Sequence, residues 1–291
     1  MPTRKILVFG TLSILFSFLI AAPLFGLQKN KTPAVLGPLL TRKATRHEVR
    51  RFGYGGTLTI VGAPKGSITV EGWQRNEVDL TADIELQAET EADLDRLAAV
   101  NGFAFDEDPI HLSLLTTGTH DRAYMKKVAK NFPKNLLNLP WKIDYKLRVP
   151  SSTDIEINGG HGPLSVSGIE GAIRVNATEG DAVLSLTGGS VSVTVAAGNV
   201  QLLIPVRSWR GSGAEVRLAA GSINVSVPPG FNGDIDADIL RTGKIESTLE
   251  LASREKPGIT EKIVRARAGA GGATFRFTVG DGVISLKKSG E

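Results

Sequence analysis

The sequence predicts an all-β fold: a β-solenoid, a β-helix-like stack of short strands, with one capping helix, a basic helical insertion and an N-terminal transmembrane helix. Apolar and polar residues alternate within residues 159–204, as they do in half-buried strands. Glycines lie between these strands, whose starts are separated by 9, 10, 8 and 9 residues and fall at Leu164, Ile173, Val183, Val191 and Val200. A coil of two such strands cannot bury its apolar row alone, so coils must stack on one another.

The composition agrees with this fold and excludes several functions. The 291 residues include 33 glycines, which suit tight corners, and only 6% aromatic residues, which suits a narrow core. The chain has no cysteine, so disulfides, thiolate metal sites, cysteine nucleophiles and lipid attachment through cysteine are excluded. The net charge of +4 is too small to indicate a nucleic-acid partner.

Residues 1–28 have the pattern of a signal anchor or a signal peptide. Two basic residues precede an uncharged, apolar run over residues 6–28. As a helix this run would reach roughly 34 Å, enough to cross a hydrocarbon core of about 30 Å. We favour the uncleaved anchor, because the positions before Ala21 and Ala22 lack the second small residue of a cleavage site.

This segment sets the expected location of the protein. An anchor would hold the chain in the cell membrane by a single pass through residues 6–28 and leave residues 29–291 extracytoplasmic. Cleavage would instead give a secreted or periplasmic protein. Residues 29–46 contain prolines and a glycine but no periodic pattern, which indicates a linker. The folded domain is expected over residues 47–291.

The folded domain is expected to open with three strands and a helix. Alternating apolar residues predict strands around residues 58–60, 68–70 and 78–84. Residues 90–101 predict a helix that begins with a capping box formed by Thr90 and Asp93. We expect this helix to cover an open end or face of the stack, because an uncovered end exposes unpaired strand groups.

A strand at residues 110–114 leads to a basic insertion at about residues 119–141. Tyr124, Val128 and Phe132 recur every four residues, as on one face of a helix. Lysines lie on its other faces, and the candidates for surface binding are Lys126, Lys127, Lys130 and Lys134. One interpretation is a helix packed on the stack with solvated lysines; the other is a segment that contacts anionic lipid or polysaccharide.

The rest of the chain continues the strand pattern. A strand over residues 143–149 precedes the repeat region. Beyond the repeat region, further strands are expected at residues 216–218, 223–227 and 235–239, with an interrupting loop at residues 207–211. Residues 274–286 are expected to hold two strands joined by a turn at Gly280-Asp281-Gly282.

Several of these pieces together resemble the bacterial putative-adhesin domain family. They are Gly66–Trp73, Leu147–Pro150, Pro163–Gly168, Gly269–Gly272 and Gly280–Leu286. The resemblance extends from about residue 53 to residue 288 and implies a β-solenoid. It also implies surface adhesion, and it supplies no catalytic residues. The family's Asn-Gly-Asp turn is replaced here by turns such as Glu179-Gly180-Asp181.

The chain offers few residues for catalysis or metal binding. No two of its four histidines have a spacing that would place them together on one element, which argues against a zinc site. Asp234, Asp236 and Asp238 alternate with apolar residues on one predicted strand. Neighbouring carboxylates there would lie roughly 6.6 Å apart, so they could hold calcium or act as acid and base on a glycosidic bond. The alternative is a solvated face that discourages edge pairing. No other cofactor is expected.

These observations favour a non-catalytic, membrane-anchored extracytoplasmic module of the cell envelope that acts in adhesion, binding or scaffolding. Its expected partners are the membrane and an envelope glycan or protein, and open strand edges would permit self-association. The alternative function is an enzyme that acts on polysaccharide from a β-helix scaffold. A groove with carboxylates and aromatic residues would favour the enzyme, and a face of Ser, Thr and Asn would favour binding. A third hypothesis is membrane-surface sensing by the lysine-rich insertion.

Overall fold

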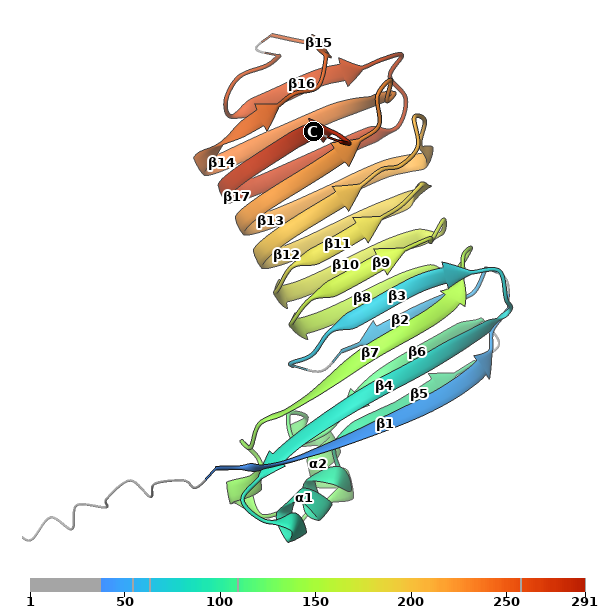
Figure 1. The fold of residues 1–291 in the computed structure, drawn as a ribbon, viewed down its shortest axis with the longest axis vertical. Coiled ribbons are helices and arrows are strands. Elements are labelled where there is room, and N and C mark those ends of the chain that lie inside the picture. The colour runs from blue at the N-terminus through green and yellow to red at the C-terminus, as the bar shows by residue number, and fades with distance from the viewer. Residues whose placement is uncertain (1–37, 54, 63, 109, 257, 291) are drawn as a thin grey trace, which may run out of the picture. The chain divides into compact units, whose positions relative to one another are not determined.

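The structure confirms the all-β fold. The computed structural model describes residues 38–290 except 54, 63, 109 and 257. Within them, seventeen strands form one continuous hydrogen-bonded sheet that curls back on itself, and two α-helices accompany it (Figure 1). The curl divides the sheet into two halves with a shared apolar core between them.

Parallel coils form the middle of this sheet. Three coils consist of two strands each: β2 (Thr57–Val61) with β3 (Ile68–Trp73), β8 (Asp154–His161) with β9 (Leu164–Ser167), and β10 (Ala172–Glu179) with β11 (Ala182–Ser185). Four further coils are single bent strands: β12 (Gly188–Leu203), β13 (Arg210–Val227), β17 (Thr274–Lys288) and β14 (Gly233–Ser247). Adjacent coils pair in parallel in this order. We call the half with β2, β8 and β10 the first half-sheet, and the half with β3, β9 and β11 the second.

The coil length matches the predicted two-strand repeat. Ile155, Ile173 and Val191 are in register across β8, β10 and β12, at intervals of 18 residues. The aliphatic residues at the predicted strand starts should all face the core, but Val183 points outward and its neighbours Ala182 and Leu184 are buried. Ala182 is in register with buried residues of β9 and β12, so the neighbouring coils determine which face of β11 is inward.

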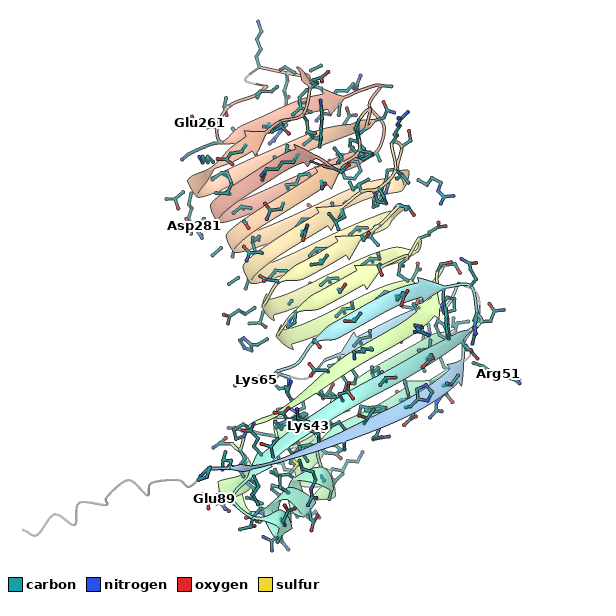
Figure 2. All side chains as sticks on the ribbon, in the orientation of Figure 1. Lys43, Arg51, Lys65, Glu89, Glu261 and Asp281 are labelled. Carbon is teal, nitrogen blue, oxygen red and sulfur yellow. The ribbon has the colours of Figure 1, made fainter. Side chains whose placement is uncertain are left out.

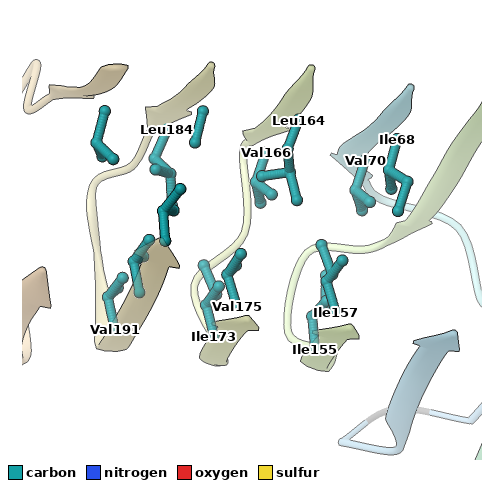
Figure 3. Close-up of a cluster of buried hydrophobic side chains, with 14 of the residues drawn as sticks. Ile68, Val70, Ile155, Ile157, Leu164, Val166, Ile173, Val175, Leu184 and Val191 are labelled. Atoms are coloured by element: carbon teal, nitrogen blue, oxygen red, sulfur yellow. The ribbon is translucent and has the colours of Figure 1, made fainter. Parts of the chain in front are cut away.

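Apolar rows from the two half-sheets meet in the core. Figure 3 shows side chains such as Ile155, Ile157 and Ile173 of the first half-sheet facing Leu164 and Val166 of the second. Each of these side chains is at most 4% exposed. This burial provides the continuous core that stacking was expected to create.

A ladder of glycines marks the corner where each coil passes from the first half-sheet to the second. In spatial order these corner glycines are Gly66, Gly162, Gly180, Gly198, Gly221, Gly282 and Gly243, with φ between 129° and 147°. A Cβ atom on any of them would lie 1.7–2.1 Å from a carbonyl oxygen of the neighbouring coil or strand. The close approach of backbones therefore requires glycine at this position of every coil.

Further strands extend the sheet before the first coil: the strand next to it in each half-sheet pairs with it in parallel, and the strands beyond pair antiparallel. The second half-sheet continues through β7 (Trp141–Pro150), β4 (Glu77–Ala88) and β1 (Leu40–Arg51). The first half-sheet continues through β6 (His111–Thr117) and β5 (Gly102–Glu107). The predicted linker at residues 29–46 and the domain start at residue 47 need correction, because β1 begins at Leu40 and pairs with β4 from that residue onward.

The predicted helix at residues 90–101 is present as α1 (Glu91–Ala98). The Oγ of Thr90 accepts a hydrogen bond from the backbone N–H of Asp93, as the capping box requires. Helix α1 connects β4 of the second half-sheet with β5 of the first and buries Leu94 and Leu97 in the core. Its position therefore closes the core between the half-sheets.

The basic insertion is less helical than predicted. It contains α2 (Arg122–Val128) and the short 3₁₀ helix η1 (Lys134–Leu136). The expected apolar stripe is also displaced, because Val128 is 52% exposed whereas Met125 is buried. With only seven residues in α2, the four-residue spacing could not continue to Phe132.

The far end of the sheet departs from sequence order. Strand β17 lies between β13 and β14, although β14 comes before it in the sequence. The predicted turn at Gly280-Asp281-Gly282 is a corner within the single strand β17, since both parts of β17 pair in parallel with the same neighbours. Strands β16 (Ile263–Ala268) and β15 (Leu251–Ser253) then extend the first half-sheet antiparallel to β14 and to each other.

The predicted signal anchor or signal peptide at residues 1–28 lies outside the described residues. Among the residues that are described, no helix is long and apolar enough to cross a membrane.

Candidate ligand-binding sites

The three predicted carboxylates of β14 are each paired with arginine. Asp238 accepts two hydrogen bonds from Nη2 of Arg265, at 2.7 and 2.9 Å. Asp234 accepts one from Nε of Arg267 at 2.9 Å. Asp236 accepts one from Arg254. Arg265 and Arg267 belong to β16, which pairs with β14, so two neighbouring strands bring these opposite charges together.

This pairing changes the interpretation of the aspartates. Calcium binds six to eight oxygen ligands, and a catalytic pair needs carboxyl groups that can reach a substrate. Here guanidinium groups occupy the acceptor positions, and the three carboxylate side chains are only 15–29% exposed. In the described part of the chain, no group of three or more His, Cys, Asp or Glu side chains could hold a metal ion.

A groove of about 650 Å³ runs along the outside of the first half-sheet, just before the corner glycines. It crosses the six coils from β8 to β14, which lie about 4.8 Å apart, so its length is on the order of 24 Å. Small or apolar residues form its floor: Thr178, Ala196, Ala219, Gly280 and Leu240. Such a groove can accommodate an extended ligand along the stacking direction.

Polar, mostly uncharged side chains line one side of the groove. They are Asn158, Asn176, Thr194 and Thr278, together with Arg217. Nδ2 of Asn176 donates to Oδ1 of Asn158 at 3.1 Å, which forms a short ladder between adjacent coils. No carboxylate and no aromatic residue lines the groove within the described ranges. The groove is therefore lined by Asn and Thr side chains, which favours a binding function over hydrolysis.

An ionic cluster of Asp281, Arg241 and Thr242 stands at one end of the groove. Nε of Arg241 donates to Asp281 at 2.8 Å, and the hydroxyl of Thr242 donates to Asp281 at 2.7 Å. Hydrogen bonds from Arg241 and Thr242 lower the pKa of Asp281 to about 2. The cluster stabilises the irregular segment of β14 between Ile239 and Thr242, where the pairing register shifts.

Acid is expected to weaken this cluster. A carboxyl whose pKa is lower in the folded chain stabilises the fold above its unfolded pKa and loses that effect as pH falls through the folded value. Asp281 should therefore contribute stability above about pH 4 and lose it toward about pH 2. We expect Asp281→Asn to lower the urea midpoint of unfolding at neutral pH and to have little effect near about pH 2. Circular dichroism at both pH values measures this, and an equal effect at both would contradict the role.

The four predicted lysines lie where the sequence placed them, in the basic insertion. Lys126 and Lys127 are on α2, Lys130 follows it, and Lys134 begins η1. Three of them, but not Lys127, line a pocket of about 1170 Å³. Lys65, which is labelled in Figure 2 and belongs to the corner between β2 and β3, also lines this pocket.

His120 and Trp141 form one wall of this pocket. Their ring centroids are 5.4 Å apart. Burial lowers the pKa of His120, and this effect exceeds the opposite effect of the nearby Asp121 carboxylate, which raises it. The neutral form of this imidazole is therefore favoured at pH 7. The positive charge of the pocket therefore comes from its lysine and arginine side chains. The lysines of the insertion could be identified from the sequence, but Lys65 and Trp141 line the pocket only because the tertiary fold brings them there.

Comparisons with known proteins give only distant similarities. No family model matches the chain, and no curated protein matches it. A solved structure of a putative cell adhesion protein from Clostridium sporogenes shares 13% identity and a TM-score of 0.46, over 84% of this chain and 100% of that one. A putative adhesin from Bacteroides fragilis shares 13% identity and a TM-score of 0.28, over 85% and 97%.

A third solved structure, a putative lipid binding protein from Parabacteroides distasonis, shares 12% identity and a TM-score of 0.27, over 83% of this chain and 96% of that one. Two of the three names refer to adhesion. Similarity at these TM-scores carries no argument about function, so the function has to be argued from the residues of this chain.

Proposed function

We propose that this chain is a non-catalytic binding module of the cell envelope that holds an extended glycan along the groove of the first half-sheet. The observation that carries the proposal is the composition of the groove. Its Asn and Thr side chains can donate and accept hydrogen bonds with hydroxyl groups, and its floor of small residues leaves room for sugar rings. Because adjacent coils are in register, equivalent side chains recur from coil to coil and can make similar contacts along the length of the ligand.

The structure offers less support for the alternative of a polysaccharide-acting enzyme. Hydrolysis of a glycosidic bond generally uses two carboxyl groups on either side of that bond. The aspartates of β14 are held by arginines, and among the described residues the groove has no carboxylate lining it. A binding function needs neither feature.

The proposed location follows from the sequence. Residues 6–28 would anchor the chain in the cell membrane and place the groove outside the cytoplasm. Self-association through β1 is less favoured, because this edge strand carries the basic residues Arg42, Lys43, Arg46, Arg50 and Arg51. Charges on an edge strand discourage pairing with another sheet.

Filling the groove should abolish glycan binding without unfolding the protein. Ala196 and Ala219 are both exposed on the groove floor, in adjacent coils. We expect the double variant Ala196→Trp with Ala219→Trp to reduce affinity for a bound oligosaccharide at least about tenfold, a change of about 1.4 kcal/mol. Calorimetric titration with chitohexaose and cellohexaose, after a glycan-array screen, measures this effect.

A matched control is available on the opposite half-sheet. Gln201 and Asn224 are exposed and in register in the same two coils, so Gln201→Trp with Asn224→Trp places the same two indole side chains away from the groove. This control should bind like the unmodified chain. Equal affinity of the groove variant and the control would contradict the proposed site, and release of shortened oligosaccharides would contradict a non-catalytic function.

A further inference from the structure

The pocket in the basic insertion has an apolar interior. It lies between the insertion and the corner of the first coil, and its apolar lining includes Met125, Phe132, Leu137, Leu139 and Trp141. Phe132, Leu139 and Trp141 pack against the core of the domain, so the pocket rests on the folded sheet. Its volume of about 1170 Å³ is slightly above the range of about 300–1,000 Å³ that is usual for small-molecule sites.

The rim of the same pocket is strongly basic. Lys65, Arg122, Lys126, Lys130 and Lys134 all line it, whereas no Asp or Glu of the described residues does. These five side chains form no ion pair with any described residue. By contrast, arginines elsewhere in the domain are commonly paired, as Arg42 is with Glu91 and Asp95 at 2.6 Å.

Five unpaired basic side chains next to an apolar interior favour a ligand that is both anionic and apolar. Five like charges around one opening repel one another, and an anion placed among them relieves this repulsion. The apolar interior favours a ligand with a hydrocarbon body, because binding removes apolar surface of both the ligand and the pocket from water. We propose that this pocket binds a single amphiphile with an anionic headgroup, a carboxylate or a phosphate, and an acyl-type apolar body.

The geometry favours a single amphiphile over the surface of a bilayer. A helix that binds a bilayer surface presents a long apolar face to the lipid. Helix α2 has only seven residues, and its Met125 is 6% exposed. Met125, Phe132, Leu137 and Leu139 therefore line a recess, and the basic residues surround its opening.

Titration of the full chain with fatty acids tests the ligand class. Myristate should bind and change the fluorescence of Trp141, with Trp141→Phe used to identify that signal. Shorter fatty acids should bind about fourfold more weakly for each methylene removed. Myristyl alcohol, which lacks the charge, and inorganic phosphate, which lacks the apolar body, should each bind at least tenfold more weakly than myristate.

Charge reversal tests the site. The triple variant Lys126→Glu, Lys130→Glu and Lys134→Glu should weaken myristate binding at least tenfold, with an unchanged melting temperature because all three residues are exposed. Lys127→Glu is the matched control, since Lys127 is exposed on the same helix but does not line the pocket. Ala129→Trp should fill the pocket and abolish binding with every charge retained.

Several outcomes would overturn the proposal. Myristate binding that is unchanged in the triple variant, or that is lost equally in Lys127→Glu, would remove the site. Tight binding of inorganic phosphate alone would indicate a simple anion site. Binding only to phosphatidylglycerol vesicles, with no binding of monomeric myristate, would indicate a bilayer-docking surface in place of a pocket.

Discussion

Val193→Asp is expected to unfold the stack, whereas Ser192→Asp, one residue away, is expected to leave it folded. Val193 is 1% exposed and is in register with Val175 on one side and Val216 on the other. Burying a valine contributes about 1.5–3 kcal/mol, and an unpaired carboxylate in its place costs more. The combined loss is comparable to the about 5–15 kcal/mol that stabilises a typical domain.

Ser192 has a different environment although it is on the same strand. It faces outward beside Arg174 in one adjacent coil and Glu215 in the other. A new carboxylate there is solvated, and the attraction to Arg174 offsets the repulsion from Glu215. Thermal unfolding followed by circular dichroism distinguishes the variants. Equal melting temperatures would mean that the inward face of β12 is wrongly assigned.

Gly221→Ala is expected to be nearly as severe, although it adds a single methyl group. Gly221 has φ of 132°, a backbone conformation that residues with a side chain rarely adopt. The added Cβ would also lie 1.8 Å from the carbonyl oxygen of Gly198 in the next coil. Relief of this clash would separate two paired coils, so we expect a loss on the order of 4 kcal/mol or more.

Gly272→Ala separates the clash from the backbone strain. Gly272 has a similar φ of 138°, but a Cβ there would meet no atom within 4 Å. This control should therefore show only the cost of the strained backbone, about 1–3 kcal/mol. Urea unfolding of both variants gives the comparison. Equal destabilisation would show that close packing of the corner glycines is not what requires glycine.

The coil length and most of the core could be predicted from sequence because they depend on local alternation. Residues such as Ile173 and Val193 are unambiguous, since a large aliphatic side chain is flanked by polar ones. Val183 was assigned wrongly because the true inward residue, Ala182, is small and looks like a spacer. Its burial depends on Leu164 and Val200 in the neighbouring coils, which local alternation does not reveal.

The candidate sites were less predictable because they depend on which strands become neighbours. Asp236 and Asp238 looked solvent-facing, and nothing in their local sequence indicates that Arg254 and Arg265 will lie beside them. The groove likewise exists only after Asn158 and Asn176, 18 residues apart, come into register. The lysines of the insertion were identified, but their pocket required the distant Lys65.

The position of β17 has a consequence for biosynthesis. A ribosome releases β14 before it has made β17, so β14 emerges when its parallel partner does not yet exist. Until then β14 can pair antiparallel with β16, which follows it closely in the sequence. Folding during synthesis can therefore proceed from the N-terminus through β13, but the next strand of the stack, β17, is not yet synthesised. The coils become continuous only when residues 274–288 pair with β13 on one side and with β14 on the other.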